Sequence, residues 1–168
     1  MKIDKPIQGP RLTIRSYERF DLPFVTNMWL DPENGRYMSD PTADHVDAVF
    51  QNALDTLQDS PHGYYLIIEL AGERIGSFSV FPDGGVHDIG YCIHKDHWRR
   101  GYASEALTLM LDWMKAQGAQ KVTAEVAVQN TPSNALLRKF GFEVEQQTSF
   151  EKYKMNVRFD SYIYAKAI

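Results

Sequence analysis

Cysteine, long apolar runs and a surplus of positive charge are all missing from this sequence. Its one cysteine, Cys92, can form neither an internal disulfide nor a thiolate metal cluster, which fits a reducing, cytoplasmic setting. No apolar run approaches the ~18 residues of a membrane span, and residues 1–10 lack the apolar core of a signal peptide. We therefore expect a soluble protein with no membrane partner.

Acidic residues outnumber basic ones by 22 to 18, which gives a formal net charge of −4. Because binding to nucleic acid grows with clustered Lys and Arg, nucleic acid is not expected as a partner. The glycine patterns of dinucleotide-binding folds and of nucleotide triphosphatases are missing too. With 43% hydrophobic residues among 168 and no repeat or linker-like stretch, the sequence predicts one domain over residues 1–168.

Hydrophobic periodicity predicts a mixture of strands and helices. The predicted strands are residues 11–16, 64–70, 74–81, 86–93, 121–128 and two long ones between 142 and 168. Helices are predicted after Asp21, from Thr42 to before Pro61 with Val49 on the apolar face, before Gly118, and from Pro132 to Gly141. Short connections favour antiparallel neighbours, and strand–helix–strand order over 86–128 predicts one parallel crossover. The expected class is α+β: a mostly antiparallel, twisted sheet of six to seven strands with a central parallel pair and about four flanking helices.

The stretch "HWRRGYASEA", residues 97–106, places two arginines and several small residues where an apolar strand gives way to an amphipathic helix. Backbone N–H groups at a helix N-terminus lack partners within the helix and attract anions. Gly101 and Ala103 leave the main chain accessible to a pyrophosphate, and Arg99 and Arg100 add charge at its rim. The pattern predicts a phosphate-binding loop, although a helix start with two solvated arginines shares it.

Two segments, "DIGYCIHKDHWRRGYASEAL" and "NTPSNALLRKFGF", resemble the GNAT superfamily of acetyl-CoA-dependent N-acetyltransferases. They are most similar to the branch of ribosomal-protein N-terminal acetyltransferases and their relatives that act on small amines. Residues 98–103 match the family's pyrophosphate loop, Q/R-x-x-G-x-G/A, with Trp98 in the first position, and residues 130–142 match its N-x-x-S…K-x-G-F segment. The opening "RLTIR", the "DPE" loop and the terminal "DSYIYA" extend the resemblance over nearly the whole chain.

The resemblance implies acetyl-CoA as the co-substrate and a V-shaped slot for its pantetheine arm between the strands "DIGYCI" and "KVTAEVAV". The arm would bond to the backbone of Cys92 and Ile93 in the manner of an added strand, and Asn130 would also bond it. The pyrophosphate would lie on the main chain of Arg99, Arg100, Gly101, Tyr102, Ala103 and Ser104.

Transfer of an acetyl group from a thioester to an amine needs a neutral amine, a place for developing negative charge and a proton for the leaving thiolate. The resemblance makes Asp88 the candidate base, because this branch usually has Glu there, in "E-I-G-Y". The shorter Asp can act directly or through a water, and it can equally be a plain exposed strand carboxylate. Glu69 and Glu73 are weaker alternative bases.

Ser133 is the candidate donor of a proton to the thiolate, because the resemblance places it near the sulfur. A serine at this position can also satisfy backbone N–H groups at a helix start, and the two roles are compatible. Many GNAT enzymes instead have a tyrosine acid at the position of Leu137. A tyrosine acid at that position is therefore not expected here.

The resemblance also places Trp29, Tyr37 and Met38 where the family's first helices form the acceptor wall. They are candidate substrate contacts, and ordinary core packing explains them equally well. The pair His94 and His97 has a spacing that can suit a metal, but no third ligand stands at a motif spacing. No metal is expected, and both histidines are placed at the rim of the slot.

The expected function is direct transfer of an acetyl group from acetyl-CoA to a primary amine, either a small molecule or the α-amine of a peptide or protein. The alternative is a non-catalytic acyl-CoA-binding regulatory module. The long C-terminal strands could also pair two copies of the chain, so a monomer and a homodimer are both compatible with the sequence.

Overall fold

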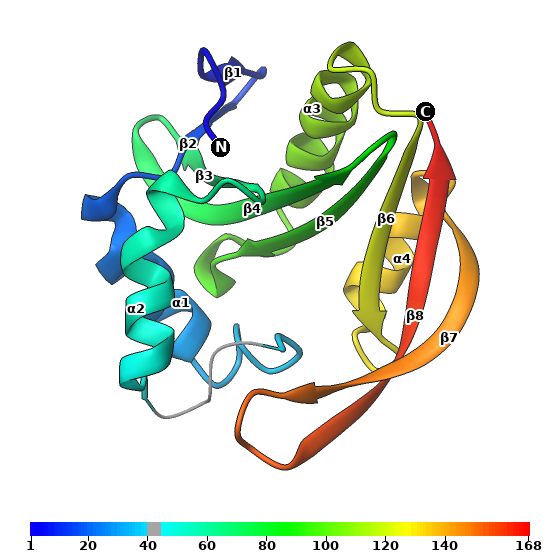
Figure 1. The fold of residues 1–168 in the computed structure, drawn as a ribbon. Helices are drawn as coiled ribbons and strands as arrows, with labels where there is room; N and C mark the ends of the chain where they lie inside the picture. The colour runs from blue at the N-terminus through cyan, green and yellow to red at the C-terminus, as the bar shows by residue number, and fades with distance from the viewer. Residues whose placement is uncertain (40–44) are drawn as a thin grey trace.

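Eight strands form one mixed sheet in the computed structural model, which describes residues 1–39 and 45–168. Their order across the sheet is β1-β2-β3-β4-β5-β6-β8-β7 (Figure 1). The sheet has one strand more than expected, because the two-residue β1 is too short to show an alternating pattern and yet pairs with β2. The strands are β1 (Ile7–Gln8), β2 (Leu12–Ser16), β3 (Tyr64–Leu70), β4 (Glu73–Asp83), β5 (Val86–Ile93), β6 (Lys121–Ala127), β7 (Glu143–Lys152) and β8 (Val157–Ala167).

Four α-helices flank the sheet in the described ranges, as the periodicity predicts. Both α3 and α4 are followed by a glycine with positive φ, Gly118 at +89° and Gly141 at +78°, a conformation that favours glycine over other residues. None of the helices described is both long and apolar enough to cross a membrane. The helices are α1 (Leu22–Leu30), α2 (Ala48–Thr56), α3 (Tyr102–Ala116) and α4 (Thr131–Lys139).

Helix α2 starts later than the sequence predicts. The predicted start at Thr42 lies outside the described residues, and the helix begins after Asp47, whose carboxylate accepts a 2.8 Å hydrogen bond from the amide of Phe50. Val49, expected on the apolar face, is 68% exposed, whereas Leu54 is buried. The prediction for Val49 is wrong because five residues along a helix turn a side chain through about 140°, away from the face that Leu54 occupies.

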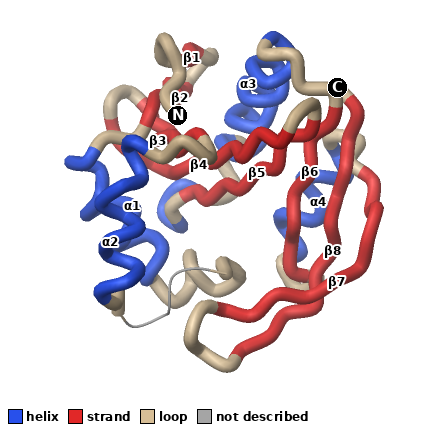
Figure 2. Tube along the Cα trace, viewed as in Figure 1, coloured by secondary structure: helices blue, strands red, loops and turns tan. Residues whose placement is uncertain are grey.

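Strand β3 alternates between two hydrophobic cores. Leu66 and Ile68 belong to the larger core, which α3 covers, whereas Ile67 belongs to a smaller core with Val25 of α1. Figure 2 shows α1 and α2 together beside β3 and β4, apart from α3 and α4. Among the described helices, none covers the opposite face of β5 and β6, which is the open face of the sheet (Figure 2).

The two central strands separate after a short parallel pairing. β5 and β6 pair only from Val86 with Lys121 to Asp88 with Thr123. Beyond that point β5 continues beside β4 and β6 continues beside β8, so the strands diverge (Figure 1). The expected splayed pair is confirmed, and the strands begin to diverge next to Asp88, where the slot is expected.

Candidate active site

Asp88 lies where β5 and β6 part, on the open face of the sheet. Its Oδ1 accepts a 2.7 Å hydrogen bond from Thr123 Oγ1 on β6. A cavity of about 380 Å³ opens beside this pair. Three acidic residues and no basic one line the cavity, whose lining is Phe81, Asp83, Val86, Asp88, Thr123, Glu125 and Ile163.

The surroundings of Asp88 favour a proton on its carboxylate. The side chain reaches solvent through the cavity, but the protein atoms around it remove part of its hydration, and this desolvation raises its pKa. The hydrogen bond from Thr123 opposes the shift, and the negative charge of Glu125 adds to it. A carboxylate with a raised pKa is a better proton acceptor than an ordinary aspartate, which suits a general base.

The two alternative bases lie elsewhere. Glu69 accepts a 2.8 Å hydrogen bond from Arg15 Nε, so its charge is engaged in an ion pair. Glu73 is 70% exposed and faces His97 at 3.7 Å. Neither residue lines the cavity beside Asp88.

The backbone of β5 faces the slot at alternate residues. His94 N donates to Ile75 O on β4 at 2.8 Å, so the alternation of an antiparallel pair directs the peptide groups of Cys92 to β4 as well. The peptide groups of Tyr91 and Ile93 point the other way, into the slot. Of the two residues expected to bond the pantetheine arm, Ile93 therefore has its amide on the side of the slot, whereas the peptide groups of Cys92 point to β4 and those of Tyr91 face the slot.

Two side chains fix the end of β5 at Ile93. Its carbonyl accepts hydrogen bonds from Asn34 Nδ2 at 2.8 Å and from Trp98 Nε1 at 2.7 Å. Asn34 Oδ1 also accepts a 2.9 Å bond from the amide of Lys95. The Ile93 carbonyl is thereby occupied, so the amide of Ile93 is the group left to face the slot.

The predicted phosphate loop has the backbone of an anion site. Arg99 and Gly101 have φ of +60° and +79°, and Gly101 is the N-cap of α3. The main-chain bonds of the helix begin with Glu105 N to Gly101 O at 3.1 Å, so the amides of residues 102–104 point out of the helix end. The side chains of Arg99 and Arg100 are exposed beside them. Alternating left-handed residues followed by free amides form the concave array that binds anions in proteins.

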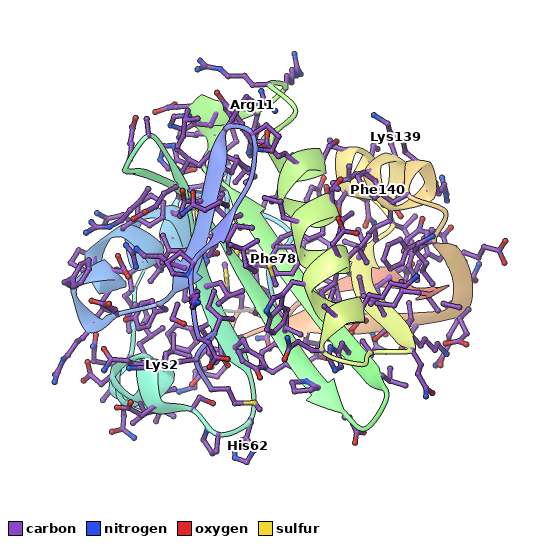
Figure 3. The ribbon with its side chains drawn as sticks, turned by 90° about the horizontal axis from the view of Figure 1, so that it is seen from above. Lys2, Arg11, His62, Phe78, Lys139 and Phe140 are labelled. Carbon is purple, nitrogen blue, oxygen red and sulfur yellow. The ribbon has the colours of Figure 1, made fainter. Side chains whose placement is uncertain are left out.

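Arg11 holds this loop against β2. Its Nε donates to Glu105 Oε2 at 2.7 Å, its Nη1 donates to Arg100 O at 3.0 Å, and its guanidinium lies 4.6 Å from the ring centroid of Tyr102. The amides of Arg11 and Leu12 both donate to Glu105 Oε1. Figure 3 shows Arg11 on the β2 side of the N-terminal end of α3.

The first turn of α4 forms the far wall of the slot. Asn130 caps the helix, its Oδ1 accepting a 3.4 Å bond from the amide of Ser133. Ser133 Oγ lies 2.7 Å from Tyr91 Oη across the slot. Burial raises the pKa of Tyr91 to about 12, although the bond with Ser133 opposes this rise. One turn later Leu137 is fully buried in the core, so it faces no substrate.

The expected acceptor contacts lie apart from Asp88. Trp29 lines a second cavity, of about 210 Å³, which shares no lining residue with the cavity at Asp88. The Tyr37 ring packs edge-on against Phe159 of β8 at 5.6 Å, and the Met38 carbonyl accepts a 2.9 Å bond from Lys152. The three candidates thus lie where the end of α1 and the loop after it meet the β7–β8 hairpin.

Sequence reasoning missed Thr123, Tyr91, Asn34 and Arg11 as parts of this site. Thr123 is placed by the register of the parallel pair, and Tyr91 meets Ser133 through contact between residues 42 positions apart. The spacing of the motifs does not encode either relationship. Only the alternation of β5, with Tyr91 two residues before Ile93, offered a signal.

Comparison with known proteins identifies the family of this chain. A family model described as "Acetyltransferase (GNAT) domain" matches residues 11–143. The curated relative "Uncharacterized N-acetyltransferase p20" of Bacillus licheniformis is 31% identical over 143 residues, covering 80% of this chain and 80% of that protein.

Solved structures share the fold over almost the whole chain. RimL, a ribosomal-protein alpha-N-acetyltransferase solved in complex with Coenzyme A, is 18% identical, with a TM-score of 0.82 and coverage of 98% of both chains. A GNAT-family acetyltransferase from Bacillus anthracis is 23% identical, with a TM-score of 0.78, covering 97% of this chain and 98% of that one. Since the family model spans well over half of the sequence, this chain belongs to the GNAT family of acetyltransferases.

Proposed function

We propose that this protein transfers an acetyl group from acetyl-CoA directly to a primary amine, with Asp88 as the base. The observation that carries the proposal is the position of Asp88 where β5 and β6 part, with the unbonded amides of residues 102–104 at the start of α3, beyond the same strand. The thioester and the amine can therefore approach from opposite faces of the sheet.

Acetyl-CoA would be held by groups that the fold leaves free. The amides of residues 102–104, with Arg99 and Arg100 beside them, would bind the pyrophosphate. The peptide groups of Tyr91 and the amide of Ile93 would pair with the pantetheine arm along β5. Asn130 would contact the arm from α4 while it caps that helix.

The amine would enter through the cavity beside Asp88. The acidic lining of this cavity, Asp83, Asp88 and Glu125, favours a positively charged amine over an anionic acceptor. Asp88 would take a proton from the amine, directly or through a water, so that a neutral nitrogen attacks the thioester carbonyl. Ser133, on the other side of the slot, would donate a hydrogen bond to the departing sulfur. No covalent bond to the protein is needed.

Thiol release from acetyl-CoA by the purified protein tests this function. Polyamines, amino acids, aminoglycosides and N-terminal peptides are offered in turn, and mass spectrometry of the acceptor identifies the acetylated product. Release that depends on an acceptor supports the transferase. Binding of acetyl-CoA without transfer to any acceptor would instead favour a regulatory module that binds acyl-CoA.

The proposed cellular setting is the cytoplasm. The single cysteine and the use of acetyl-CoA suit the cytoplasm. Strand β7 is an edge strand of the sheet, so a homodimer through this edge and a monomer are both compatible with the fold. Sedimentation of the purified chain distinguishes the two assemblies.

A further inference from the structure

Two hydroxyl groups meet across the slot, one from β5 and one from the first turn of α4, which forms the far wall. Tyr91 extends from β5 to the helix side of the sheet, where it packs against the larger core. Its Oη lies 2.7 Å from Ser133 Oγ in the first turn of α4. Within the described residues, Tyr91 is the hydrogen-bond partner that the structure provides for the Ser133 hydroxyl.

Both ends of this bridge are held in place. The ring of Tyr91 stacks on Phe78 of β4, with centroids 5.9 Å apart and planes 25° apart. At the other end, Asn134 Nδ2 donates to Ala127 O at 2.9 Å, and Asn134 Oδ1 accepts a 2.7 Å bond from Tyr164 Oη. These bonds tie the first turn of α4 to the end of β6 and to β8. Packing on one side and hydrogen bonds on the other therefore hold the elements that carry the two hydroxyls.

Either hydroxyl could donate this bond, and their acidities favour one direction. A phenol is more acidic than an alcohol, so it is the better donor, and the alcohol oxygen is the better acceptor. A serine hydroxyl has one hydrogen and two lone pairs. When Tyr91 fills one lone pair of Ser133, the Ser133 hydrogen is free for another acceptor. The raised pKa of Tyr91, about 12, keeps the phenol protonated throughout the neutral range, so its hydrogen is available to Ser133.

We propose that Tyr91 is a positioning residue, which donates to Ser133 Oγ and thereby directs the Ser133 hydrogen into the slot, toward the sulfur of a bound acetyl thioester. This inference rests on the proposed acetyl transfer. A bond forms between the amine nitrogen and the carbonyl carbon, the carbon–sulfur bond breaks, and its electron pair stays on sulfur. Asp88 takes the proton of the amine, Ser133 donates a hydrogen bond to the thiolate, and the Tyr91 proton stays on its own oxygen.

The position of Tyr91 also bears on the tyrosine that many GNAT enzymes have where this chain has Leu137. Leu137 lies four residues after Ser133, one helical turn away, and is fully buried. A phenol therefore does not approach the slot from that position of α4. Tyr91 instead brings a phenol from β5 to the preceding turn of the helix, at Ser133. The two walls of the slot thus contribute one hydroxyl each.

Steady-state kinetics of Tyr91→Phe, Ser133→Ala and the double variant test the proposal. Tyr91→Phe keeps the ring stack on Phe78 and removes only the hydroxyl, so kcat should fall roughly tenfold while the KM for acetyl-CoA changes less than about twofold. Ser133→Ala should lower kcat at least as much. The double variant should be no slower than Ser133→Ala, because Tyr91 acts only through Ser133. Tyr64→Phe, a tyrosine that packs against Trp113 away from the slot, is the matched control.

Two kinetic results would overturn the assignment. If Tyr91→Phe slows the enzyme by the same factor with and without Ser133, Tyr91 acts on the fold and not through Ser133. An unchanged kcat in Tyr91→Phe would show that the bridge has no part in the reaction. A wild-type protein that acetylates no amine would instead contradict the proposed function itself.

A crystal structure of the wild-type chain with coenzyme A provides a test that needs no variant. The inference predicts Tyr91 Oη within hydrogen-bond distance of Ser133 Oγ, and Ser133 Oγ within hydrogen-bond distance of the sulfur. A complex in which Tyr91 turns away from Ser133 would overturn it. This measurement decides the question even where Tyr91→Phe does not fold or the acceptor is unknown.

Discussion

Thr123 Oγ1 donates a 2.7 Å hydrogen bond to Asp88 Oδ1 across the last pair of residues that β5 and β6 share. This bond stabilises the charged carboxylate, whereas desolvation and the charge of Glu125 stabilise the protonated form. The balance of these three effects sets the pH at which Asp88 can accept a proton. The hydrogen bond and the charge can each be altered by a single substitution beside the cavity.

Removing the Thr123 hydroxyl should move the acid limb of the pH–rate profile toward higher pH. Thr123→Val keeps the shape of the side chain and deletes the bond that lowers the pKa of Asp88. Asp88 then stays protonated up to a higher pH, so kcat/KM begins to rise at a higher pH than in the wild type. The measurement is kcat/KM against pH with a fixed acceptor. A profile identical to that of the wild type would contradict the role given to Thr123.

Neutralising Glu125 should move the same limb in the opposite direction. Glu125 raises the pKa of Asp88 by like-charge repulsion, so Glu125→Gln should let Asp88 ionise at lower pH. The same variant should raise the KM for a cationic acceptor, because the cavity loses one of its negative charges. Glu143→Gln, which changes an exposed acid on β7, is the matched control. A shift to higher pH in Glu125→Gln would contradict the account.

Loss of Arg11 should weaken acetyl-CoA binding and leave the chemical step alone. Arg11 connects β2 to Glu105, Arg100 and Tyr102, so Arg11→Met frees the phosphate loop without touching Asp88. We expect the KM and Kd for acetyl-CoA to rise roughly threefold to tenfold, the size of one or two partly exposed polar contacts, with kcat nearly unchanged.

Glu105→Gln is the partner variant for this prediction. Because Glu105 accepts the bonds of Arg11, the two substitutions together should cost less than the product of their separate effects. Calorimetric titration with acetyl-CoA measures all four proteins. An Arg11→Met protein that binds acetyl-CoA as tightly as the wild type would show that the loop keeps its shape without this support.

His87 should make the fold sensitive to mild acid. Its side chain is 6% exposed on β5, its Nδ1 has no hydrogen-bond partner among the described residues, and burial lowers its pKa from 6.5. Below pH 6.5 His87 binds a proton in the unfolded chain but stays neutral in the folded chain. The free energy of unfolding therefore falls as the pH decreases toward the lowered pKa, with a slope of at most about 1.4 kcal/mol per pH unit.

Urea unfolding at pH 7.5 and pH 5.5 measures this effect. His87→Leu should lose most of the difference between the two values, whereas His62→Gln, on the exposed loop before β3, should keep it. Equal acid sensitivity in the wild type and in His87→Leu would assign the effect to other groups.

Local chemistry made much of the fold predictable from sequence. Alternation placed the strands, glycines such as Gly118 and Gly141 marked the ends of helices, and the loop around Gly101 indicated the start of α3. The two-residue β1 and the cap at Asp47 were missed, because neither leaves a periodic pattern.

The contacts within the site were harder to predict because they join distant segments. That Thr123 meets Asp88 depends on the register of a parallel pair, which the length of the intervening helix and turn sets. The direction of the Cys92 backbone depends on which residues of β5 bond to β4. The Tyr91–Ser133 bridge depends on where α4 begins relative to β5. Each relationship is a property of packing and not of any motif.

The most direct test of the account compares Asp88→Asn with the wild type at saturating acetyl-CoA and acceptor. Asparagine keeps an oxygen for the Thr123 bond and cannot take the proton of the amine. We expect kcat to fall by about 100-fold or more and the acid limb of the pH profile to disappear. The Kd for acetyl-CoA should stay within about twofold of the wild-type value. Asp112→Asn, an exposed acid on α3, should behave as the wild type. An Asp88→Asn protein that retains wild-type kcat and the same pH profile would contradict the assignment of Asp88 as the base.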